Sequence, residues 1–487
     1  MSPPTSSHPL IPAEIDAEMT PAVRAFVHAL IAGFQSQINI LQSQIVDLNA
    51  KISDLESQVK KLTPQNSSIP PSSVHPHAKA LKNKPKSGKS RGGQKGHPRH
   101  QRALVPVDQC DSIIALMPST CRCCQKPLSG EDSSPIRHQV YELPVIKAFI
   151  TEYQRHRLHC TRCGTTTCAE LPIGVPSGQS GPRLIAFTAL LMGHFRQSKR
   201  LASEFLRDLL NIPCCPATTV KMQDIASAAL AKPHEELRQS LASERNVFMD
   251  ETPTKQANTK AWLWTAVANQ FVVFSVFASR AATAIESLLG SNFEGIINCD
   301  RAKMYYVAKH LQWCWAHLIR DIQAMIDSKV PDRVGFGTQV MKEVKEVFRL
   351  WHRFKQGQIE WEEFQNSAIP IAKKINELLY AGMGSHDSKL RNQCKSLYVH
   401  RNRLWLFISN QGLEPTNNRA ERALRKAVIY RKLSFGTQSE GGSRFIERIF
   451  SVAATCRIQN RSVYQYLVRA IEAKLTNQPA PKILPTP

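Results

Sequence analysis

The sequence has a marked shortage of acidic residues. Asp and Glu total 39 against 63 Lys and Arg in 487 residues, which leaves a formal net charge of +24. Because each neutralised phosphate releases a counterion, a surplus of this size indicates a polyanionic partner. The composition alone leaves open whether that partner is DNA, RNA or an anionic membrane.

Long hydrophobic runs are also missing. The N-terminus is polar and proline-rich, with no basic residue before Arg24 and no apolar core, so we expect no signal peptide. The one stretch that resembles a membrane span, residues 261–278, is interrupted by Asn269 and Gln270 and is rich in Val, Phe and Trp, which favours two paired strands. A P-loop is absent as well, so we expect no step driven by a nucleoside triphosphate.

Cysteine is present in an odd number, 13, and partly in C-x-x-C pairs. In a large basic chain without a signal peptide, this pattern predicts metal binding in the reducing cytoplasm rather than a disulfide framework. Two such pairs, Cys121/Cys124 and Cys160/Cys163, supply four thiolates for a structural zinc in a module at residues 108–178. Residues 139–153 between them are expected to form a strand or hairpin. Two extra thiols lie close by, Cys123 and Cys168, so the ligand choice between Cys123 and Cys124 stays open.

A chain of this length predicts three or more modules, and the first is a coiled coil at residues 21–63. Its heptads place β-branched residues at one seam position and leucine at the other, which favours two parallel strands and a homodimer or higher assembly. The alternative, one amphipathic helix docked on its own chain, fits four unbroken heptads less well. One seam consists of Ile38, Ile45, Ile52 and Val59, and the other of Leu41, Leu48, Leu55 and Leu62.

The next segment, residues 64–107, is a basic arm. Residues 57–107 contain 11 Lys and Arg and no Asp or Glu, with Pro, Ser, Gly and His between them, so we expect disorder in isolation. A solvated linker is the simpler interpretation, and an arm that follows phosphates or enters a minor groove is the functional one. The candidate nucleic-acid-binding residues are Lys89, Arg91, Lys95, Arg99 and Arg102.

Residues 179–243 form a predicted helical module. A break at residues 211–213 is followed by residues 216–219, which resemble an N-cap before a helix that begins near Val220. Helix, short break and capped helix is also the outline of a helix-turn-helix, so DNA contact and plain packing are equally supported.

The segment from residue 246 to residue 306 has the pattern of a β-meander. A short apolar strand is expected to end at Asp250, a strand pair follows at residues 262–267 and 271–277, and a buried strand ends at Asp300 after a short helix at residues 282–289. Either Asp alone would most simply be a cap or turn residue. Together in one sheet they suggest a shared divalent cation, Mg²⁺ or Mn²⁺, because such ions prefer carboxylate oxygen.

Several motifs together resemble the insertion-sequence-66-type transposases. They are the arm sequence Arg-Gly-Gly-Gln-Lys-Gly-His-Pro at residues 91–98, the paired knuckles, Met-Asp-Glu-Thr at 249–252, Cys314-x-x-His317-x-x-Arg320, residues 416–425 with Asn-Asn-Arg-Ala-Glu-Arg, Arg431-Lys432, and the Gly-rich residues 436–442. The resemblance implies an RNase H-like catalytic core of the DDE type. It also implies a Mg²⁺-dependent transposase that binds and cuts the double-stranded DNA ends of its own element and joins them to target DNA, with accessory proteins of the element as further partners.

The resemblance also implies the site residues. Asp250, Asp300 and Glu421 are the expected catalytic, metal-binding triad, and His317 and Arg320 are expected to assist near the phosphate. Glu421 is preferred to Glu414, because the residue before a proline is extended and Glu414 would lie on a turn. In this family Gly-Tyr usually follows the second Asp, whereas residues 301–304 follow it here, and Tyr305 or Tyr306 is expected to take the role of the aromatic residue. The Gly-rich residues 436–442 could cradle a phosphate, although an ordinary turn is favoured.

The expected fold class is therefore multidomain α+β, in which a helical insertion splits the catalytic core. Helices are predicted at residues 342–350, 358–364 and 372–380 of that insertion, with Trp351 and Trp361 in packing roles. Two other functions remain: a non-catalytic zinc-containing DNA-binding regulator, and an RNase H-like nuclease or resolvase without strand transfer. The last four predicted segments are the first part of the core at residues 244–324, the insertion at 325–410, the second part of the core at 411–475 and a tail at 476–487.

Overall fold

The computed structural model describes residues 11–61, 102–328 and 330–484. The predicted basic arm therefore lies outside the described residues except for its last six. Helix accounts for 54% of the structure and accompanies a mixed sheet, so the α+β class is confirmed. None of the described helices is long and apolar enough to cross a membrane. The chain divides into two compact units: one comprises the described residues of Met1–Pro76, Asn298–Arg301 and Leu311–Asn417, and the other those of His77–Ile297, Ala302–His310 and Asn418–Pro487.

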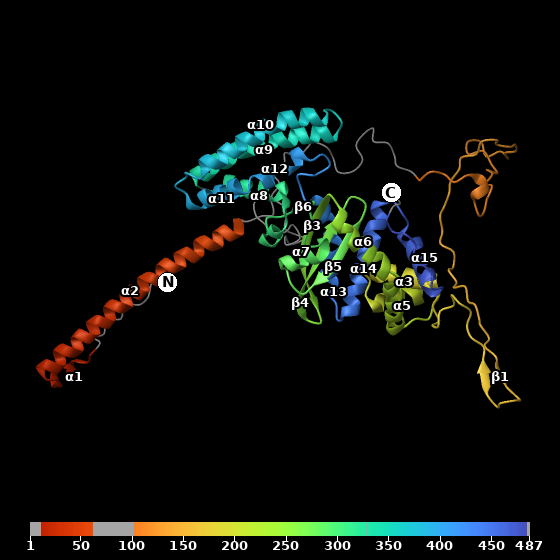
Figure 1. Cartoon of the computed structure of the whole chain (residues 1–487), viewed down its shortest axis with the longest axis horizontal. Helices are drawn as coiled ribbons and strands as arrows, with labels where there is room; N and C mark the ends of the chain where they lie inside the picture. Colours follow the sequence, from red (N-terminus) through yellow and green to blue (C-terminus); the bar gives the residue numbers. More distant parts are fainter. Residues whose placement is uncertain (1–10, 62–101, 329, 485–487) are drawn as a thin grey trace. The chain divides into compact units, whose positions relative to one another are not determined.

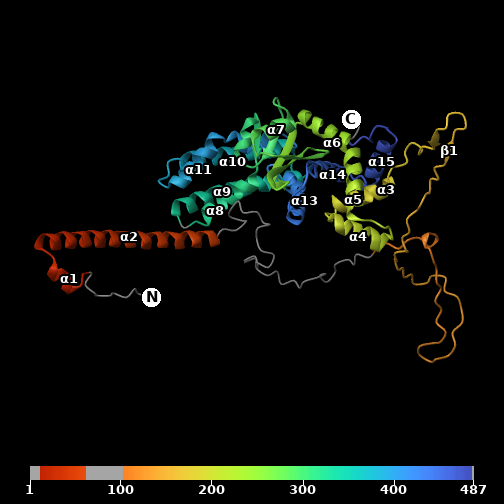
Figure 2. The ribbon, with the colours of Figure 1, turned by 90° about the horizontal axis from the view of Figure 1, so that it is seen from below.

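The first unit begins with a short helix, α1 (Ala13–Glu18), and a 41-residue helix, α2 (Pro21–Lys61), which is continuous in Figure 2. The helix covers the predicted heptads. Ile38, Leu41 and Leu48 on its two seams are 51–56% exposed, so their apolar surface is still available to a partner. The helix is confirmed, and its pairing into a coiled coil stays a prediction.

The rest of the first unit is the helical insertion. Helix α9 covers the predicted helix at 342–350, but the two helices predicted at 358–364 and 372–380 are wrong as separate elements. Both belong largely to α10, which continues through Pro370. A proline inside a helix costs about 3 kcal/mol or more, and packing of α10 against α9, α11 and α12 outweighs that cost. The helices are α8 (Trp315–Ile326), α9 (Pro331–Lys355), α10 (Trp361–Gly382), α11 (Ser388–Val399) and α12 (Asn402–Ser409).

Aromatic side chains hold these helices together. Trp351 on α9 lies with its ring centroid 5.5 Å from that of Phe364 on α10 and 5.7 Å from that of Phe407 on α12. Trp361 packs on the ring of Phe364 as well. The packing role predicted for both tryptophans is confirmed.

The second unit contains the predicted meander. Strand β3 (Asn246–Gln256) pairs antiparallel with β4 (Thr259–Val267), which pairs antiparallel with β5 (Val272–Phe277). Residues 257 and 258 make the tight turn between β3 and β4 with positive φ angles of 48° and 63°. The segment that resembled a membrane span therefore forms most of two paired strands, as predicted.

Two short strands complete the sheet, in the order β5-β4-β3-β6-β7. Strand β6 (Ile296–Cys299) follows helix α7 (Ala282–Leu289), and β7 (His310–Trp313) follows a 3-10 helix at Lys303–Val307. The unit boundary falls within β6. The first residues of β6 belong to the unit that contains β3, and there the Ile296 N–H donates to the Arg245 carbonyl at 2.8 Å. The last residues of β6 belong to the unit that contains the segment after β7, and there the Cys314 N–H donates to the Cys299 carbonyl at 2.8 Å.

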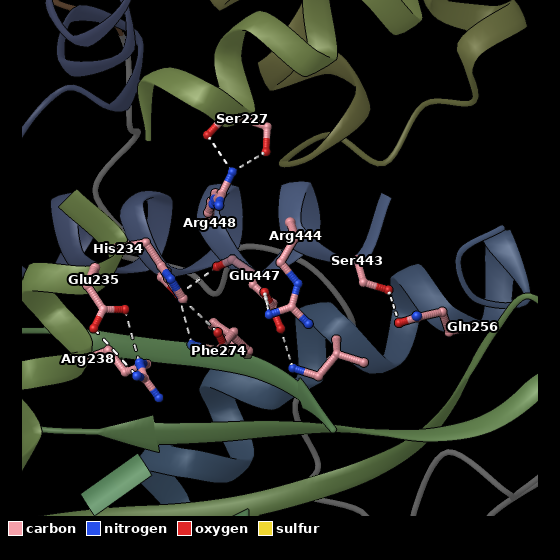
Figure 3. Close-up of polar contacts among 12 residues, drawn as sticks. Ser227, His234, Glu235, Arg238, Gln256, Phe274, Ser443, Arg444, Glu447 and Arg448 are labelled. Carbon is pink, nitrogen blue, oxygen red and sulfur yellow. Dashed lines mark hydrogen bonds and ion pairs between the residues drawn. The ribbon is translucent and has the colours of Figure 1, made fainter. Parts of the chain in front are cut away.

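The edge strand β5 is covered by helix α14 (Glu440–Ile458), whose ribbon is drawn with β5 in Figure 1. The helix presents a stripe of buried polar residues to the strand, among them Glu447, which Figure 3 shows. The N–H groups of Val272, Phe274 and Val276 donate to side-chain oxygens four residues apart on the helix. Four helical residues rise 6.0 Å and two strand residues about 6.6 Å, so the two rows match. The acceptors are Thr455 Oγ1 at 3.1 Å, Ser451 Oγ at 2.8 Å and Glu447 Oε1 at 2.6 Å.

Helices α3 to α6 form the predicted helical module (Figure 2). The break at residues 211–213 is confirmed, but α5 begins at Pro216, earlier than the predicted start near Val220, because proline fits the first turn of a helix. Helix α5 packs against α3, α4, α14 and α15 (Val463–Leu475), and its exposed residues are confined mainly to a narrow strip. Packing thus accounts for most of its surface, and DNA contact by the module stays a prediction. The bounds are α3 (Pro182–Met192), α4 (Lys199–Leu210), α5 (Pro216–Ala229) and α6 (Ala231–Ser240).

Candidate active site

Asp250 lies in the middle of β3, opposite Thr265 of β4. The prediction that the strand ends at Asp250 is wrong, because β3 continues to Gln256. Thr252 and Thr254 beyond the carboxylate are β-branched and suit an extended strand, and β4 supplies pairing partners along the whole segment. The Asp250 carboxylate is partly buried and accepts the backbone N–H of Glu251 at 2.9 Å.

The neighbouring Glu251 is a site residue that sequence reasoning missed. Its side chain is 3% exposed and forms an ion pair with Arg280 at 2.5 Å. The Tyr305 hydroxyl donates to its other carboxylate oxygen at 2.6 Å, and the buried Tyr305 ring packs edge-on against Trp264. Tyr305 therefore occupies a fixed, buried position five residues after Asp300, where an aromatic role was expected. The signal in the sequence was the Met-Asp-Glu-Thr motif, in which only the Asp had been assigned.

Glu421 lies in the first turn of α13 (Asn418–Ser434), within the same unit as Asp250. Ala420, Leu424 and Ala427 are the buried face of this helix, which packs on β3 and β4 (Figure 1). Ile429 lies outside this buried face, and its side chain is 37% exposed. The helix thus holds Glu421 on a rigid element against the strand that carries Asp250.

Arg419 fixes the start of α13. Its guanidinium donates to the carbonyl oxygens of Ala268 at 3.0 Å and Asn269 at 3.2 Å in the β4–β5 turn, and lies over the Phe248 ring. The first Arg of the Asn-Asn-Arg-Ala-Glu-Arg motif therefore ties the helix to the meander.

Asp300 follows the last residue of β6, as predicted, and belongs to the first unit. His317 and Arg320 lie one turn apart on α8 in that unit. Burial, together with the charge of Arg320, lowers the pKa of His317 to about 4, although Asp300 is close enough to oppose the shift. His317 is therefore neutral near pH 7. Arg301 pairs with Asp321 of α8 at 3.1 Å, so a charge that replaces the family's glycine is neutralised locally.

The segment that leads into α13 is anchored within the first unit. The Asn298 side chain donates to the Glu414 carbonyl at 2.6 Å, the Trp315 N–H donates to the Pro415 carbonyl at 2.9 Å, and the Asn417 N–H donates to Cys314 Sγ at 3.1 Å. Glu414 lies outside any helix, in the extended segment before proline that was expected for it. Asn298 was not foreseen as a positioning residue.

The triad is therefore distributed over the two units. Asp250 and Glu421 lie in the second unit on elements that pack together, and Asp300, His317 and Arg320 lie in the first. Three carboxylates offer hard oxygen donors, which fit Mg²⁺ or Mn²⁺ and the phosphate chemistry those ions serve.

Residues 436–439 of the Gly-rich segment form a bend that contains a bridge to β3, and residues 440–442 begin α14. Thr437 pairs with the end of β3, where its N–H donates to the Lys255 carbonyl at 2.9 Å, and Ser439 caps α14 by accepting the Gly442 N–H. Gly436 has a φ of 114°, and a Cβ atom there would lie 2.3 Å from the Lys255 carbonyl oxygen. Close backbone approach thus explains this glycine without a ligand.

Each C-x-x-C pair occupies a knuckle. The Gln125 N–H donates to the Cys121 carbonyl at 2.8 Å, and the Gly164 N–H donates to the Cys160 carbonyl at 2.9 Å between strands β1 (Arg157–His159) and β2 (Thr166–Cys168). Hydrogen bonds from Cys124 and Cys123 lower the pKa of Cys121, and those from Thr165 lower the pKa of Cys163, which favours thiolates in both knuckles. Among the described residues, no group of three or more metal-ligating side chains includes these cysteines.

A further expectation for this region has a clear outcome. Residues 139–153 are extended but form no strand or hairpin, so that prediction is wrong; apolar side chains such as Phe149, 95% exposed, have no sheet to pack on. All 13 cysteines lie in described residues, and none of them forms a disulfide. Arg102 is the one arm candidate in the described part and lies over the Tyr141 ring at 4.3 Å.

The comparisons with known proteins identify the family of the chain. The model of the family "Transposase IS66 family" matches residues 178–444, which is 267 of the 487 residues and includes Asp250, Asp300 and Glu421. The chain therefore belongs to the IS66 family of transposases. Residues 1–103 match a second family, of unknown function. A relative, the uncharacterized protein y4qI of Sinorhizobium fredii (strain NBRC 101917 / NGR234), is 24% identical over 403 residues, which cover 75% of this chain and 72% of the relative.

Proposed function

We propose that the protein is the transposase of an insertion sequence, and that it cuts DNA at the ends of its element and joins them to target DNA. The observation that carries the proposal is the packing of α13, with Glu421 in its first turn, on the strand that bears Asp250, inside a region matched by a transposase family. The sheet order β5-β4-β3-β6-β7, a meander followed by two added strands, supports an RNase H-like core.

Asp250, Asp300 and Glu421 would hold two Mg²⁺ ions. Bound Mg²⁺ supplies charge neutralisation at the phosphate and lowers the pKa of a water that serves as nucleophile. The three carboxylates lie on β3, directly after β6 and in the first turn of α13. His317, neutral above its pKa of about 4, offers a ring N–H to a phosphate oxygen, and Arg320 offers a positive charge.

The chemistry requires no external energy. Attack of water on the phosphorus at the element end breaks one P–O bond and leaves a 3′-hydroxyl and a 5′-phosphate. That hydroxyl then attacks a target phosphodiester, and the bond to phosphorus that forms replaces the one that breaks. A single active site therefore serves both steps.

Zinc at Cys121, Cys124, Cys160 and Cys163 would be structural, because four thiolates leave no open coordination position. The basic arm with Lys89, Arg91, Lys95, Arg99 and Arg102 would follow DNA phosphates, and α2 would join two copies through its heptads. Accessory proteins of the element would be further partners.

The experiment compares Glu421→Gln and Asp250→Asn with Glu414→Gln on DNA that carries the element's ends. If Glu421 is a metal ligand, Glu421→Gln should lose Mg²⁺-dependent nicking and joining activity. The loss should exceed the roughly 10- to 100-fold that is typical when a residue that hydrogen-bonds to a metal ligand is replaced. Glu414→Gln should stay near wild type, and the melting temperature and end binding of all three variants should be unchanged.

The other outcomes separate the alternatives. Near-wild-type nicking by Glu421→Gln together with loss in Glu414→Gln would show that the wrong glutamate was chosen. End binding by the wild-type chain without any nicking would identify a regulator, and nicking without joining would identify a nuclease or resolvase.

A further inference from the structure

A cavity of about 280 Å³ lies in the second unit beside the helix that carries Glu421. One wall of the cavity is cationic and is built from three parts of the chain. Three of its side chains lie on α13, one lies in the loop after α3, and one lies in the last turn of α14. They are Arg419, Arg422, Lys426, Arg196 and Arg457. Spacings of three and four residues place the three α13 side chains on the same face. The cavity therefore lies along the helix that carries the proposed catalytic carboxylate, Glu421, in its first turn.

Among the described residues, no carboxylate lines the cavity, and no ion pair within 4.0 Å joins any of its five cations to an acidic side chain. Arg419 does lie close enough to Glu244 to oppose the rise that burial causes in the pKa of that carboxyl. Burial and the charges of Arg457 and Arg196 lower the pKa of Lys426. Burial and the same group of cations lower the pKa of His194 to about 4, which leaves it neutral to accept a hydrogen bond from Arg457.

Arg196 is held in an uncommon backbone conformation. Its φ is 61°, in the left-handed region that costs an L-residue energy. The preceding turn is fixed by Gly193, where a Cβ atom would lie 2.6 Å from the Ile449 side chain of α14. The close approach of Gly193 to Ile449 therefore fixes the course of this segment, and Arg196 lines the cavity.

The floor of the cavity is apolar. Val272 and Phe274 of β5 and Phe450 of α14 line it, and the two phenylalanine rings meet edge to face at 5.7 Å. A water molecule occupies about 30 Å³ of liquid volume, so the cavity is much larger than a lone phosphate requires. A cationic rim above an apolar, partly aromatic floor suits an anion that carries a flat apolar group.

We propose that this cavity binds one unpaired nucleotide of the DNA, with its phosphate among Arg196, Lys426 and Arg457 and its base on the apolar floor. The base must be unpaired, because a base that is stacked and paired inside a duplex cannot lie on the floor of a cavity. The proposal rests on the proposed function, since it assumes that DNA is the substrate. It adds that the protein holds a strand locally separated beside the cutting site.

The test measures binding in buffer without added Mg²⁺ or Mn²⁺ and without chelator, so that cleavage plays no part and the proposed zinc site is left intact. Two fluorescent probes share one sequence: a blunt duplex and the same duplex with a short single-stranded 3′ overhang that contains 2-aminopurine. The wild-type full-length chain should bind the overhang probe about fivefold or more tightly than the blunt one, the range that stacking of one base provides. Quenching of 2-aminopurine should accompany binding.

Two variants and one control then separate the contribution of the cationic wall from the contribution of the cavity's shape. Lys426→Gln should reduce the preference for the overhang, whereas Arg425→Gln, which removes an exposed cation from another face of the same helix, should weaken both probes equally. Ala454→Leu fills the cavity and leaves every charge in place. It should abolish the preference and the quenching while blunt binding stays at the wild-type level, and thermal melting checks that each variant folds.

Contrary results are equally clear. Equal binding of the two probes by the wild type, or equal losses for both probes in Lys426→Gln and no effect of Ala454→Leu, would overturn the proposal. Tighter binding of free dAMP than of the overhang would assign the cavity to a free nucleotide instead. A failure of the proposed transposase function would appear in the Mg²⁺ nicking assay and would leave these binding ratios unaffected.

Discussion

Replacing Glu447 by glutamine tests how the buried carboxylate on α14 responds to pH. Its side chain is 1% exposed, accepts the Val276 N–H at 2.6 Å and pairs with Arg444 at 3.0 Å. Burial raises the pKa of Glu447 from 4.5 to about 7, although the Val276 N–H and the arginines oppose the shift. Figure 3 shows this carboxylate between Arg444 and the strand.

The sign follows from proton binding. Between pH 4.5 and pH 7 the folded protein keeps a proton on Glu447 that the unfolded chain has released, so the free energy of unfolding falls as pH rises through that window. Each pH unit costs about 1.4 kcal/mol, and the whole window costs on the order of 3 kcal/mol. Glutamine carries no charge, and its side-chain oxygen still accepts the Val276 N–H.

We therefore expect the stability of Glu447→Gln relative to wild type to increase by about 3 kcal/mol between acid and neutral pH. Urea unfolding of both proteins between pH 4.5 and pH 8 measures the difference. Glu440→Gln, which removes an exposed carboxylate from the first turn of the same helix, should show a difference that does not depend on pH. A flat difference for Glu447→Gln, or one that grows toward acid, would refute the reasoning.

Two further predictions concern assembly and metal. Leu48→Pro lies on the leucine seam of α2 and should destabilise the helix by about 3 kcal/mol or more. In sedimentation the variant should therefore be a monomer, whereas the wild-type full-length chain should be associated. A wild-type monomer at tens of micromolar would contradict self-association. The purified chain should hold one zinc, which metal analysis should find lost in Cys163→Ser and retained in Cys168→Ser. Absence of zinc from wild-type protein purified without chelator would exclude a structural site, and retention in Cys124→Ser would point to Cys123.

Local pattern was enough to predict the meander and the helix at residues 342–350, which lies within α9. Short runs of apolar and β-branched residues predicted strands β4, β5 and β6. The change from apolar to charged residues at Asp300 predicted the end of β6. Boundaries failed where tertiary pairing outweighed local sequence. Strand β3 runs past Asp250 because β4 pairs with all of it, and α10 passes through Pro370 because its neighbours hold it on several sides.

The positioning residues were harder to foresee. Ser451, Thr455 and Glu447 are polar at helical spacing, which ordinarily indicates a solvated face, and their burial depends on an edge strand more than 170 residues away in sequence. The cations of the cavity come from three separate elements in the same way. Glu251 lay inside a quoted motif, but its role depends on Arg280 and Tyr305, which no spacing connects to it.

The cover that α14 provides for β5 also bears on how copies of the protein can associate. An open strand edge is a template on which a second chain can add its own strand, and such addition leads to aggregation. At β5 three successive donors that face outward are already used by side chains of the same molecule. Two copies of the protein can be brought close together by binding to neighbouring ends of the insertion sequence or by pairing through α2. Even then, neither copy can add a strand to the other's sheet at this edge unless α14 first detaches from β5.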